Sequence, residues 1–540
     1  MKPWKIALPQ GPTEGGAMEL PIALDRGSKQ SLQAQLHEQI RRLILGARLK
    51  PGTPVPASRI LASQLGVSRN TVVLAYERLE AEGYLQTRGA IGTYVNLELP
   101  ENCLTARRPE SVATSRMHGS ARHRPIAFEG RAQTIVNDKR LACDFWLGRP
   151  DPRSFPLKAW RRLINRTLTT AGACLTEYRD PAGLIDLRKA IADHLGPTRG
   201  INVGPDQIVI VAGCQEGFNL TARLLLREGM SVAIENPAYQ GAACLYESYR
   251  ARLVPVGVDD NGLCVDALPD TGAALLYVTP SRQYPMGFTL PLERRLHLLD
   301  WARRTGTRIV EDDYDGDFRY QGSPITALMG LDSHGYVLHL GTFSRSLGAG
   351  LRLGYLVVPK HLVEATRQVK ALLDNGHSWL EQAVLAEFIA RGGYENHLRR
   401  IRQSYAERRN CLIDSLQRHF GDVTVSGTEC GMHLAWHLPR HLPRAAELQA
   451  VAAEHGVGIY TLESGGACDL GGCAYAERTV LLGFSSLDER QIRDGIERIA
   501  AAIDVARTRT HEAIASTWSG STAPARMPMA GGRVWMEGIR

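Results

Sequence analysis

Apolar residues near the start of the chain recur at helical spacing. The first run, which begins after Ser31, contains Leu32, Leu36, Ile40, Leu43 and Ile44. This spacing predicts an amphipathic helix that is stopped by Pro51 and Gly52. A second short helix is expected over 58–65, followed by a turn and a third helix from a capping serine, Ser68, to about Glu82.

The third helix is followed by two β-prone runs. They lie between Tyr84 and Val95 and flank a glycine-containing turn, which predicts a hairpin. A helix, a short turn and a serine-capped helix at this spacing are typical of a helix-turn-helix, whose second helix enters the major groove of DNA. The hairpin would then be the wing of a winged helix-turn-helix.

Beyond Asp144 the pattern changes to apolar, strand-like runs that alternate with helical patterns. The runs lie at 207–211, 231–234, 274–278, 308–311 and 337–340. Such alternation predicts an α/β domain with a mainly parallel sheet and helices on both faces. The segment from about His361 to Asp504 is helix-rich, with strand candidates at 433–437 and 479–484, and predicts a smaller C-terminal lobe.

These patterns divide the chain into five parts. They are an N-terminal tail (1–30), a winged DNA-binding domain (31–98), a basic linker (99–140), a large α/β domain (141–505) and a tail (506–540). The linker lacks periodicity and carries Arg107, Arg108, Arg116, Arg122, Arg124 and Arg131. It is either a solvated tether or a segment whose arginines touch DNA phosphates. The last tail is predicted to be disordered because it contains Gly, Ser, Pro and Ala.

Composition adds limits to this picture. With 540 residues, 44% of them apolar and 22% charged, the chain can form at least two packed units. The formal charge of +8 permits a polyanionic partner. No run approaches the ~20 apolar residues of a membrane span, and the first residues lack the apolar core of a signal peptide, so we expect a cytoplasmic protein with no membrane partner. The ten cysteines form no C-x-x-C pair, which predicts neither a disulfide framework nor a metal site.

The small domain resembles a GntR-type winged helix. The resemblance rests on V-P-A-S-R-I-L-A-S-Q-L-G-V-S-R-N-T-V and E-G-Y-L-Q-T-R-G-A-I-G-T-Y-V within 35–95. It implies that the residues facing double-stranded DNA are Arg59, Ser68, Arg69, Asn70, Thr71, Arg88 and Gly89. Arginine can read guanine, asparagine can read adenine, and hydroxyls can hold phosphates. For Arg59 and Arg88, a solvated surface charge is the plain alternative.

The chain from about Phe145 to Ala502 resembles fold-type I aminotransferases, and the order of the two domains resembles the MocR-type branch of GntR regulators. The motifs are Y-R-D-P-A-G at 178–183, G-C-Q at 213–215, E-N-P-A-Y at 235–239, T-P-S-R-Q-Y-P at 279–285 and E-D-D-Y at 311–314. The resemblance implies a pocket for pyridoxal 5'-phosphate and a homodimer. The phosphate would be held by backbone N–H groups at a helix N-terminus and by side chains. These positions are Gly213, Cys214, Gln215, Thr342, Ser344 and Arg352.

The remaining pocket residues would contact the cofactor ring. The resemblance implies that Tyr239 stacks on the ring, that Asp312 keeps the ring nitrogen protonated, and that Tyr314 hydrogen-bonds the phenolic oxygen. One position departs from the family. The aminotransferases hold the cofactor as a Schiff base through the lysine of G-T-F-S-K-S-L, whereas residues 341–347 read G-T-F-S-R-S-L, so that Arg345 takes the lysine's place. A guanidinium stays charged and cannot supply the neutral amine, so we predict no catalytic residue and no enzyme.

A pocket with these contacts and a fixed cation leaves three possibilities. Pyridoxal phosphate binds without a Schiff base, another small anionic metabolite has replaced it, or the pocket is empty and the domain is a dimerisation scaffold. We favour the first two because Asp312, Tyr314 and Arg352 would have no use in a scaffold. The leading hypothesis is a ligand-responsive, DNA-binding transcription regulator that forms a homodimer. The alternatives are an active aminotransferase with an appended DNA-binding domain, which Arg345 argues against, and a pure scaffold.

Overall fold

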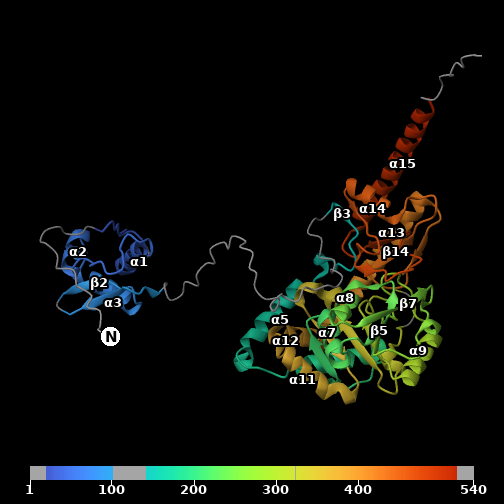
Figure 1. The fold of residues 1–540 in the computed structure, drawn as a ribbon, viewed down its shortest axis with the longest axis horizontal. Helices are drawn as coiled ribbons and strands as arrows, with labels where there is room; N and C mark the ends of the chain where they lie inside the picture. Colours follow the sequence, from blue (N-terminus) through green and yellow to red (C-terminus); the bar gives the residue numbers. More distant parts are fainter. Residues whose placement is uncertain are drawn as a thin grey trace, which may run out of the picture. The chain divides into compact units, whose positions relative to one another are not determined.

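The computed structural model describes residues 20–100, except 29 and 90, and residues 141–519, except 321 and 323. The chain forms two compact units that divide near residue 125, and each unit has a hydrophobic core of its own (Figure 1). The start of the predicted N-terminal tail (1–19), most of the predicted linker (101–140) and the end of the predicted C-terminal tail (520–540) lie outside the described residues.

The small unit has the predicted order of three helices and a hairpin. Its elements are α1 (Leu32–Leu45), α2 (Ser58–Leu65), α3 (Arg69–Ala81), β1 (Leu85–Arg88) and β2 (Gly92–Val95). Leu36, Ile40 and Ile44 are buried on one side of α1, as their spacing predicts. Gly66 ends α2 in the left-handed conformation, which glycine adopts without strain, and the Ser68 hydroxyl caps α3. The winged helix-turn-helix prediction is therefore confirmed.

The small unit begins earlier than the predicted boundary at residue 31. Leu20, Ile22 and Leu24 pack against its core, and the side-chain oxygen of Gln35 accepts a hydrogen bond from the backbone N–H of Asp25 at 2.9 Å. At the other end, Leu99 is buried in the same core. The sequence pattern missed these edges because an extended segment that packs with a few side chains has no helical periodicity.

The large unit is built around a mixed sheet of eight strands. Their order is β4-β12-β11-β10-β9-β5-β7-β8, and only β12 and β8 run against the others. The strands are β4 (Ile208–Val211), β5 (Ser231–Asn236), β7 (Arg252–Asp259), β8 (Gly262–Leu263), β9 (Leu275–Val278), β10 (Arg308–Asp313), β11 (Val337–Thr342) and β12 (Gly354–Val357). The sheet confirms the mainly parallel α/β prediction and adds β7, β8 and β12, which the apolar runs did not indicate.

Helices cover both faces of this sheet. They are α5 (Leu157–Thr169), α6 (Ile185–Arg199), α7 (Cys214–Leu225), α8 (Gln240–Ser248), α9 (Leu292–Thr305), α10 (Leu328–Leu331), α11 (Val363–Asp374) and α12 (Trp379–Ala390). Leu275 and Tyr277 of β9 pack with α7 and α8, whereas Leu276 and Val278 pack with α9. Because alternate residues of a strand point to opposite faces, both sets must be apolar, which explains the unbroken apolar run of β9 (Figure 1).

The C-terminal lobe contains a second, antiparallel sheet. Its strands are β13 (Thr424–Ser426), β14 (His433–His437) and β17 (Thr479–Gly483), and its helices are α13 (Gly393–Phe420), α14 (Ala445–Glu454) and α15 (Glu489–Ser519) (Figure 1, orange and red). Short β3 (Cys143–Asp144) pairs with β15 (Val457–Gly458), and β6 (Ala238–Tyr239) pairs with β16 (Ala467–Cys468). No helix in the described residues is both long and apolar enough to span a membrane.

Two expectations for this lobe need correction. The helices α11 and α12, which we had assigned to it, contact α7 and α5–α6 respectively and belong with the large sheet. The predicted disordered tail was also wrong over 506–519, because α15 continues to Ser519. Residues 506–519 contain no Gly or Pro, and the stretch rich in Gly, Ser and Pro begins only at Gly520.

We expect Leu36→Ala to destabilise the small unit by about 2–5 kcal/mol, because it leaves a cavity at a fully buried position of α1. Since the two units have separate cores, calorimetry should show the transition of the small unit moving down while that of the large unit stays in place. Leu45→Ala, on the same helix but 45% exposed, is the matched control and should change little. A shift of both transitions by Leu36→Ala would mean that the units unfold together.

Candidate functional site

A cavity of about 390 Å³ lies at the carboxyl ends of the parallel strands, a position and size typical of ligand sites in α/β folds. Thr342 ends β11, Asp312 lies near the end of β10, and Gly213 follows β4. All ten residues predicted for the cofactor line this one cavity. They are Gly213, Cys214, Gln215, Tyr239, Asp312, Tyr314, Thr342, Ser344, Arg345 and Arg352. We call it the strand-end cavity.

One end of the strand-end cavity is suited to an anion. Helix α7 starts directly after Gly213, whose φ of +95° favours glycine. A Cβ atom at Gly213 would lie 3.2 Å from a guanidinium nitrogen of Arg352, so the lack of a side chain lets the arginine approach the start of the helix. Arg352 itself has a φ of +52° and donates a hydrogen bond to the carbonyl of Ala212. A helix N-terminus beside an arginine attracts a phosphate or carboxylate.

Asp312 is the carboxylate of the strand-end cavity. The Tyr277 hydroxyl donates to its Oδ2 at 2.9 Å, and the Cys214 thiol lies 3.6 Å from its Oδ1. Burial raises the pKa of Asp312 to about 6, although both hydrogen bonds favour the charged form. A buried carboxylate near its titration point can accept a further hydrogen bond from a cationic ring N–H, as the cofactor interpretation requires.

Three tyrosine rings form the wall beside Asp312. The Tyr284 ring lies edge-to-face with Tyr239 at 5.5 Å and with Tyr314 at 5.6 Å between ring centroids. The Tyr284 hydroxyl donates to the carbonyl of Gly465, but the buried Tyr314 hydroxyl has no hydrogen-bond partner among the described residues. The side-chain oxygen of Gln215 is also buried without a partner. Buried polar atoms are nearly always paired, so these two atoms fit a polar ligand in the cavity.

Arg345 lies on a single turn of π-helix, Ser344–Gly348, and brings a permanent charge into the strand-end cavity. Its guanidinium donates to the carbonyl of Gly148 at 2.6 Å and lies 5.9 Å from the ring centroid of Tyr314. Burial opposes the charge, but Asp315 and the nearby tyrosines outweigh it and raise the pKa of Arg345. No lysine is among the described residues that line the cavity. The set therefore fits a ring-and-phosphate ligand held without a covalent bond.

Sequence reasoning missed several residues of this cavity. Tyr277, which holds Asp312, lies inside an apolar strand where its role has no sequence signal. Gly148 contacts Arg345 across 197 positions of sequence, and a Cβ atom there would lie 1.5 Å from the guanidinium. Trp146, Gly465 and Gly466 also line the cavity.

The predicted DNA-facing residues of the small unit lie on its surface. Arg59, Ser68, Arg69 and Asn70 are exposed, and Thr71 is half-buried. Ser68 accepts a hydrogen bond from the Thr71 backbone N–H at 3.1 Å and so caps α3, and the Thr71 hydroxyl lies 2.9 Å from the capping hydroxyl. Arg69 lies 3.5 Å from the hydroxyl of Ser58, which places it beside the start of α2, where Arg59 lies.

The wing residues form a second group. Arg88 is exposed at the end of β1, with its guanidinium 5.2 Å from the Tyr94 ring centroid, and Gly89 has a φ of +42° in the turn that follows. The Glu80 carboxylate of α3 accepts a hydrogen bond from the backbone N–H of Thr87 at 2.9 Å, which ties the hairpin to the third helix. The structure therefore brings Arg59 and residues 68–71 together and places Arg88 and Gly89 on the attached hairpin.

We expect Asp312→Asn to remove a pH-dependent loss of stability. Because burial raises the pKa of Asp312 from 3.8 to about 6, the folded state keeps a proton that the unfolded chain releases, and stability falls as the pH rises between these values. Above this window, in the absence of ligand, the variant should be the more stable protein by roughly 2–3 kcal/mol at most. Urea unfolding at several pH values measures this. Asp422→Asn, at an exposed position, is the matched control, and equal pH profiles for Asp312→Asn and wild type would contradict the expectation.

Comparisons with known proteins agree with both units. Residues 32–95 match the family described as bacterial regulatory proteins, gntR family, and residues 144–499 match aminotransferase class I and II. The solved structure of an archaeal alanine:glyoxylate aminotransferase is 25% identical, with a TM-score of 0.61 over 68% of this chain and 91% of that one. A kynurenine aminotransferase of Pyrococcus horikoshii is 26% identical, with a TM-score of 0.61 over 70% of this chain and 96% of that one.

Curated relatives match most of this chain. The probable rhizopine catabolism regulatory protein MocR of Rhizobium meliloti is 35% identical over 89% of this chain and 95% of its own length. The pyridoxine biosynthesis transcriptional regulator PdxR of Corynebacterium glutamicum is 34% identical over 74% of this chain and 82% of its own length. The regulator TauR of Rhodobacter capsulatus is 32% identical over 90% of this chain and 100% of its own length. The names of these three relatives describe regulators, two of them of the helix-turn-helix type. This chain, with a gntR-family winged helix followed by a fold-type I aminotransferase domain, belongs to the MocR-type subfamily of GntR regulators.

Proposed function

We propose that this protein is a transcription regulator that binds an operator in double-stranded DNA and whose aminotransferase-like domain binds pyridoxal phosphate, or a related small anionic metabolite, without a Schiff base. It acts as a homodimer in the cytoplasm, where its operator DNA lies. The observation that carries the proposal is the strand-end cavity, which combines unpaired polar atoms with a permanent cation, Arg345, and no lysine among the described lining residues.

The DNA contact is assigned to one exposed group on the small unit. Arg69 and Asn70 start α3 and carry the hydrogen-bonding groups that can read guanine and adenine in the major groove. Arg59 lies at the start of α2, and Arg88 with Gly89 lies on the wing, where they would contact phosphates or the minor groove. The helix-turn-helix names of PdxR and TauR support this assignment.

The ligand contact is assigned to the strand-end cavity. The start of α7 with Arg352 would hold the phosphate, Tyr239 would stack on the ring, and Asp312 and Tyr314 would hydrogen-bond the ring nitrogen and the phenolic oxygen. Pyridoxal phosphate, when bound, supplies an aldehyde that reacts with amines and a ring that draws electrons. Arg345 stays protonated, so it can orient an anionic or carbonyl oxygen but cannot take up a proton as a general base.

Regulation then follows from a difference in ligand affinity between two arrangements of the protein. A ligand that closes the cavity shifts the population toward one arrangement, and in a dimer this changes the spacing of the two winged helices on the operator. A pure scaffold would show no such coupling. Isothermal calorimetry with pyridoxal phosphate, followed by operator titration with and without it, separates the two: absence of both binding and an effect on DNA would leave only the scaffold.

We expect Arg69→Ala to weaken specific operator binding by ~1–3 kcal/mol, the usual effect of losing one base contact. Fluorescence anisotropy with an operator selected from a random DNA pool measures the affinity. Arg42→Ala, which removes the same charge from an exposed position on α1, controls for the general effect of charge. Equal affinities of Arg69→Ala and wild type would show that α3 is not the recognition helix.

We expect Arg345→Lys to gain covalent attachment of pyridoxal phosphate, because lysine can supply a neutral amine at the same place in the cavity. After borohydride reduction, mass spectrometry should find the added mass on the peptide that contains residue 345. Arg345→Gln, which has neither the cation nor an amine, and the wild type should stay unmodified. Trapping of the wild type at some other lysine, together with turnover of amino acids, would support an active aminotransferase instead.

A further inference from the structure

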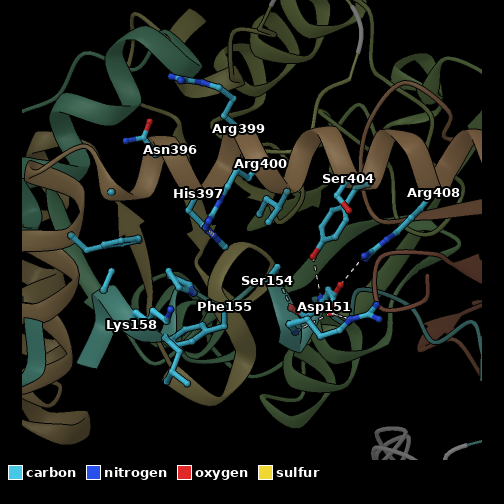
Figure 2. Close-up of a pocket in the computed structure, with 18 residues that line it drawn as sticks. Asp151, Ser154, Phe155, Lys158, Asn396, His397, Arg399, Arg400, Ser404 and Arg408 are labelled. Carbon is cyan, nitrogen blue, oxygen red and sulfur yellow. Dashed lines mark hydrogen bonds and ion pairs between the residues drawn. The ribbon is translucent and has the colours of Figure 1, made fainter. Parts of the chain in front are cut away.

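The large unit contains a second, larger cavity that has no role in the function proposed above. It has a volume of about 1100 Å³ and lies between the segment 151–159, which leads into α5, and helix α13 (Figure 2). Figure 2 shows Arg400 extending from α13 toward Phe155 and Lys158, while Ser404 and Arg408 line the other end near Asp151. We call it the α5–α13 cavity.

The charge of the α5–α13 cavity is strongly positive. Its cationic side chains are Arg153, Lys158, Arg399, Arg400 and Arg408, and its one carboxylate among the described lining residues is Asp151. Asp151 is 4% exposed and forms ion pairs with Arg153 at 2.9 Å and Arg408 at 2.7 Å, and these two partners lower its pKa against the effect of burial. The one carboxylate among the described lining residues is therefore already paired with two arginines and does not neutralise the other cations.

The other cations have no such partner. In the described part of the chain, no carboxylate lies within 4 Å of Lys158, Arg399 or Arg400; the nearest polar contact of Arg400 is the ring of His397, at 3.5 Å. The Nε of Arg408, a residue only 7% exposed, also has no hydrogen-bond partner, although Glu489 lies 3.9 Å away. Lys158, Arg399 and Arg400 are exposed to solvent, and an anion in the cavity would satisfy them together with the Nε of Arg408.

The floor of the α5–α13 cavity is apolar. Phe155, Pro156, Phe388 and Ile401 line it beside the cations. A phosphate backbone of DNA offers charge but no surface to cover an apolar floor, whereas a small organic anion with an aromatic or aliphatic body matches both features. Nor do the undescribed segments of this chain carry a negative excess: residues 1–19 carry two Lys against two Glu, residues 101–140 carry eight Lys and Arg against four Asp and Glu, and residues 520–540 carry three Arg against one Glu.

We propose that the α5–α13 cavity is a second ligand site, which takes a small organic sulfonate, phosphate or carboxylate with an apolar body. Arg400 and Lys158 bind the anionic group, and Phe155, Phe388 and Ile401 cover the apolar part. This inference is independent of the DNA assignment. Its test uses the cofactor assignment only to occupy the strand-end cavity with pyridoxal phosphate, and the variants at Arg400 and Lys158 distinguish the two cavities.

The α5–α13 cavity is connected to the strand-end cavity by direct contacts. His397, which lines the former and lies against Arg400, forms a 2.7 Å hydrogen bond with the carbonyl of Ser346, the residue next to Arg345. Gly148, which accepts the hydrogen bond from Arg345, is three residues from Asp151. Two contacts, Arg400 with His397 and His397 with the carbonyl of Ser346, therefore link Arg400 to the backbone that holds Arg345.

The probe for the test is anilinonaphthalene sulfonate, whose fluorescence rises when its rings enter apolar surroundings. With the full-length protein saturated with pyridoxal phosphate, to fill the strand-end cavity, we expect saturable binding of one probe per chain. Arg400→Gln and Lys158→Gln should each weaken it about tenfold, the usual result of losing one charge-assisted contact. Ser404→Trp, which fills the space, should abolish it, and Arg400→Lys should retain most of it.

Arg418→Gln is the matched control, since Arg418 is exposed on the same helix and does not line the α5–α13 cavity. Octanesulfonate should displace the probe, whereas inorganic sulfate at the same concentration should not, because it has no apolar body. No saturable binding, or equal affinity in all variants, would overturn the proposal. Loss of DNA affinity in Arg400→Gln and Lys158→Gln with unchanged probe binding would overturn it in favour of a nucleic-acid surface.

Discussion

The guanidinium of Arg345 stays protonated, and this permanent positive charge lies in the strand-end cavity. The carbonyl of Gly148 accepts its hydrogen bond at 2.6 Å, and the face of Tyr314 lies close to it. Because Asp315 and three tyrosines favour the charged form despite burial, the cation persists at every physiological pH. A site with a permanent cation can recognise an anion or a carbonyl group, but it lacks the neutral amine from which covalent chemistry of this kind begins.

Several other features of the strand-end cavity do not stabilise the fold. Asp312 is buried at the expense of its charge, the Tyr314 hydroxyl and the Gln215 oxygen are unpaired, and Arg352 has a left-handed backbone conformation. Each feature lowers the stability of the ligand-free protein, and a chain under no demand to bind would be stabilised by replacing them. Their presence together at the ends of the parallel strands argues against a scaffold without a ligand.

Much of this fold could be predicted from local sequence, and the reasons for the misses are physical. The helices of the small unit follow from the spacing of Leu36 and Ile40 and from the cap at Ser68, all local signals. Strand β7 was missed because only Val256 in it is buried and its Pro and Gly weaken a strand signal. The ten cavity residues were found through motifs, whereas Tyr277 and Gly148 were not, since their roles arise from contacts with residues distant in sequence.

The residues of the α5–α13 cavity could not be predicted from local sequence either, because they come together only in the fold. From the sequence alone, Arg399 and Arg400 would be assigned to the solvated face of a long helix, and Lys158 to the exposed start of another helix. Only the fold sets them around Phe155 and Phe388, across more than two hundred positions, with a single carboxylate that is already paired. His397 forms a hydrogen bond with the carbonyl of Ser346, next to Arg345, and Gly148, which accepts the hydrogen bond from Arg345, is three residues from Asp151, so the proposed second site borders the backbone that holds Arg345. Should ligands in both cavities bias this stretch of backbone, linkage would require each to change the affinity for the other by the same factor.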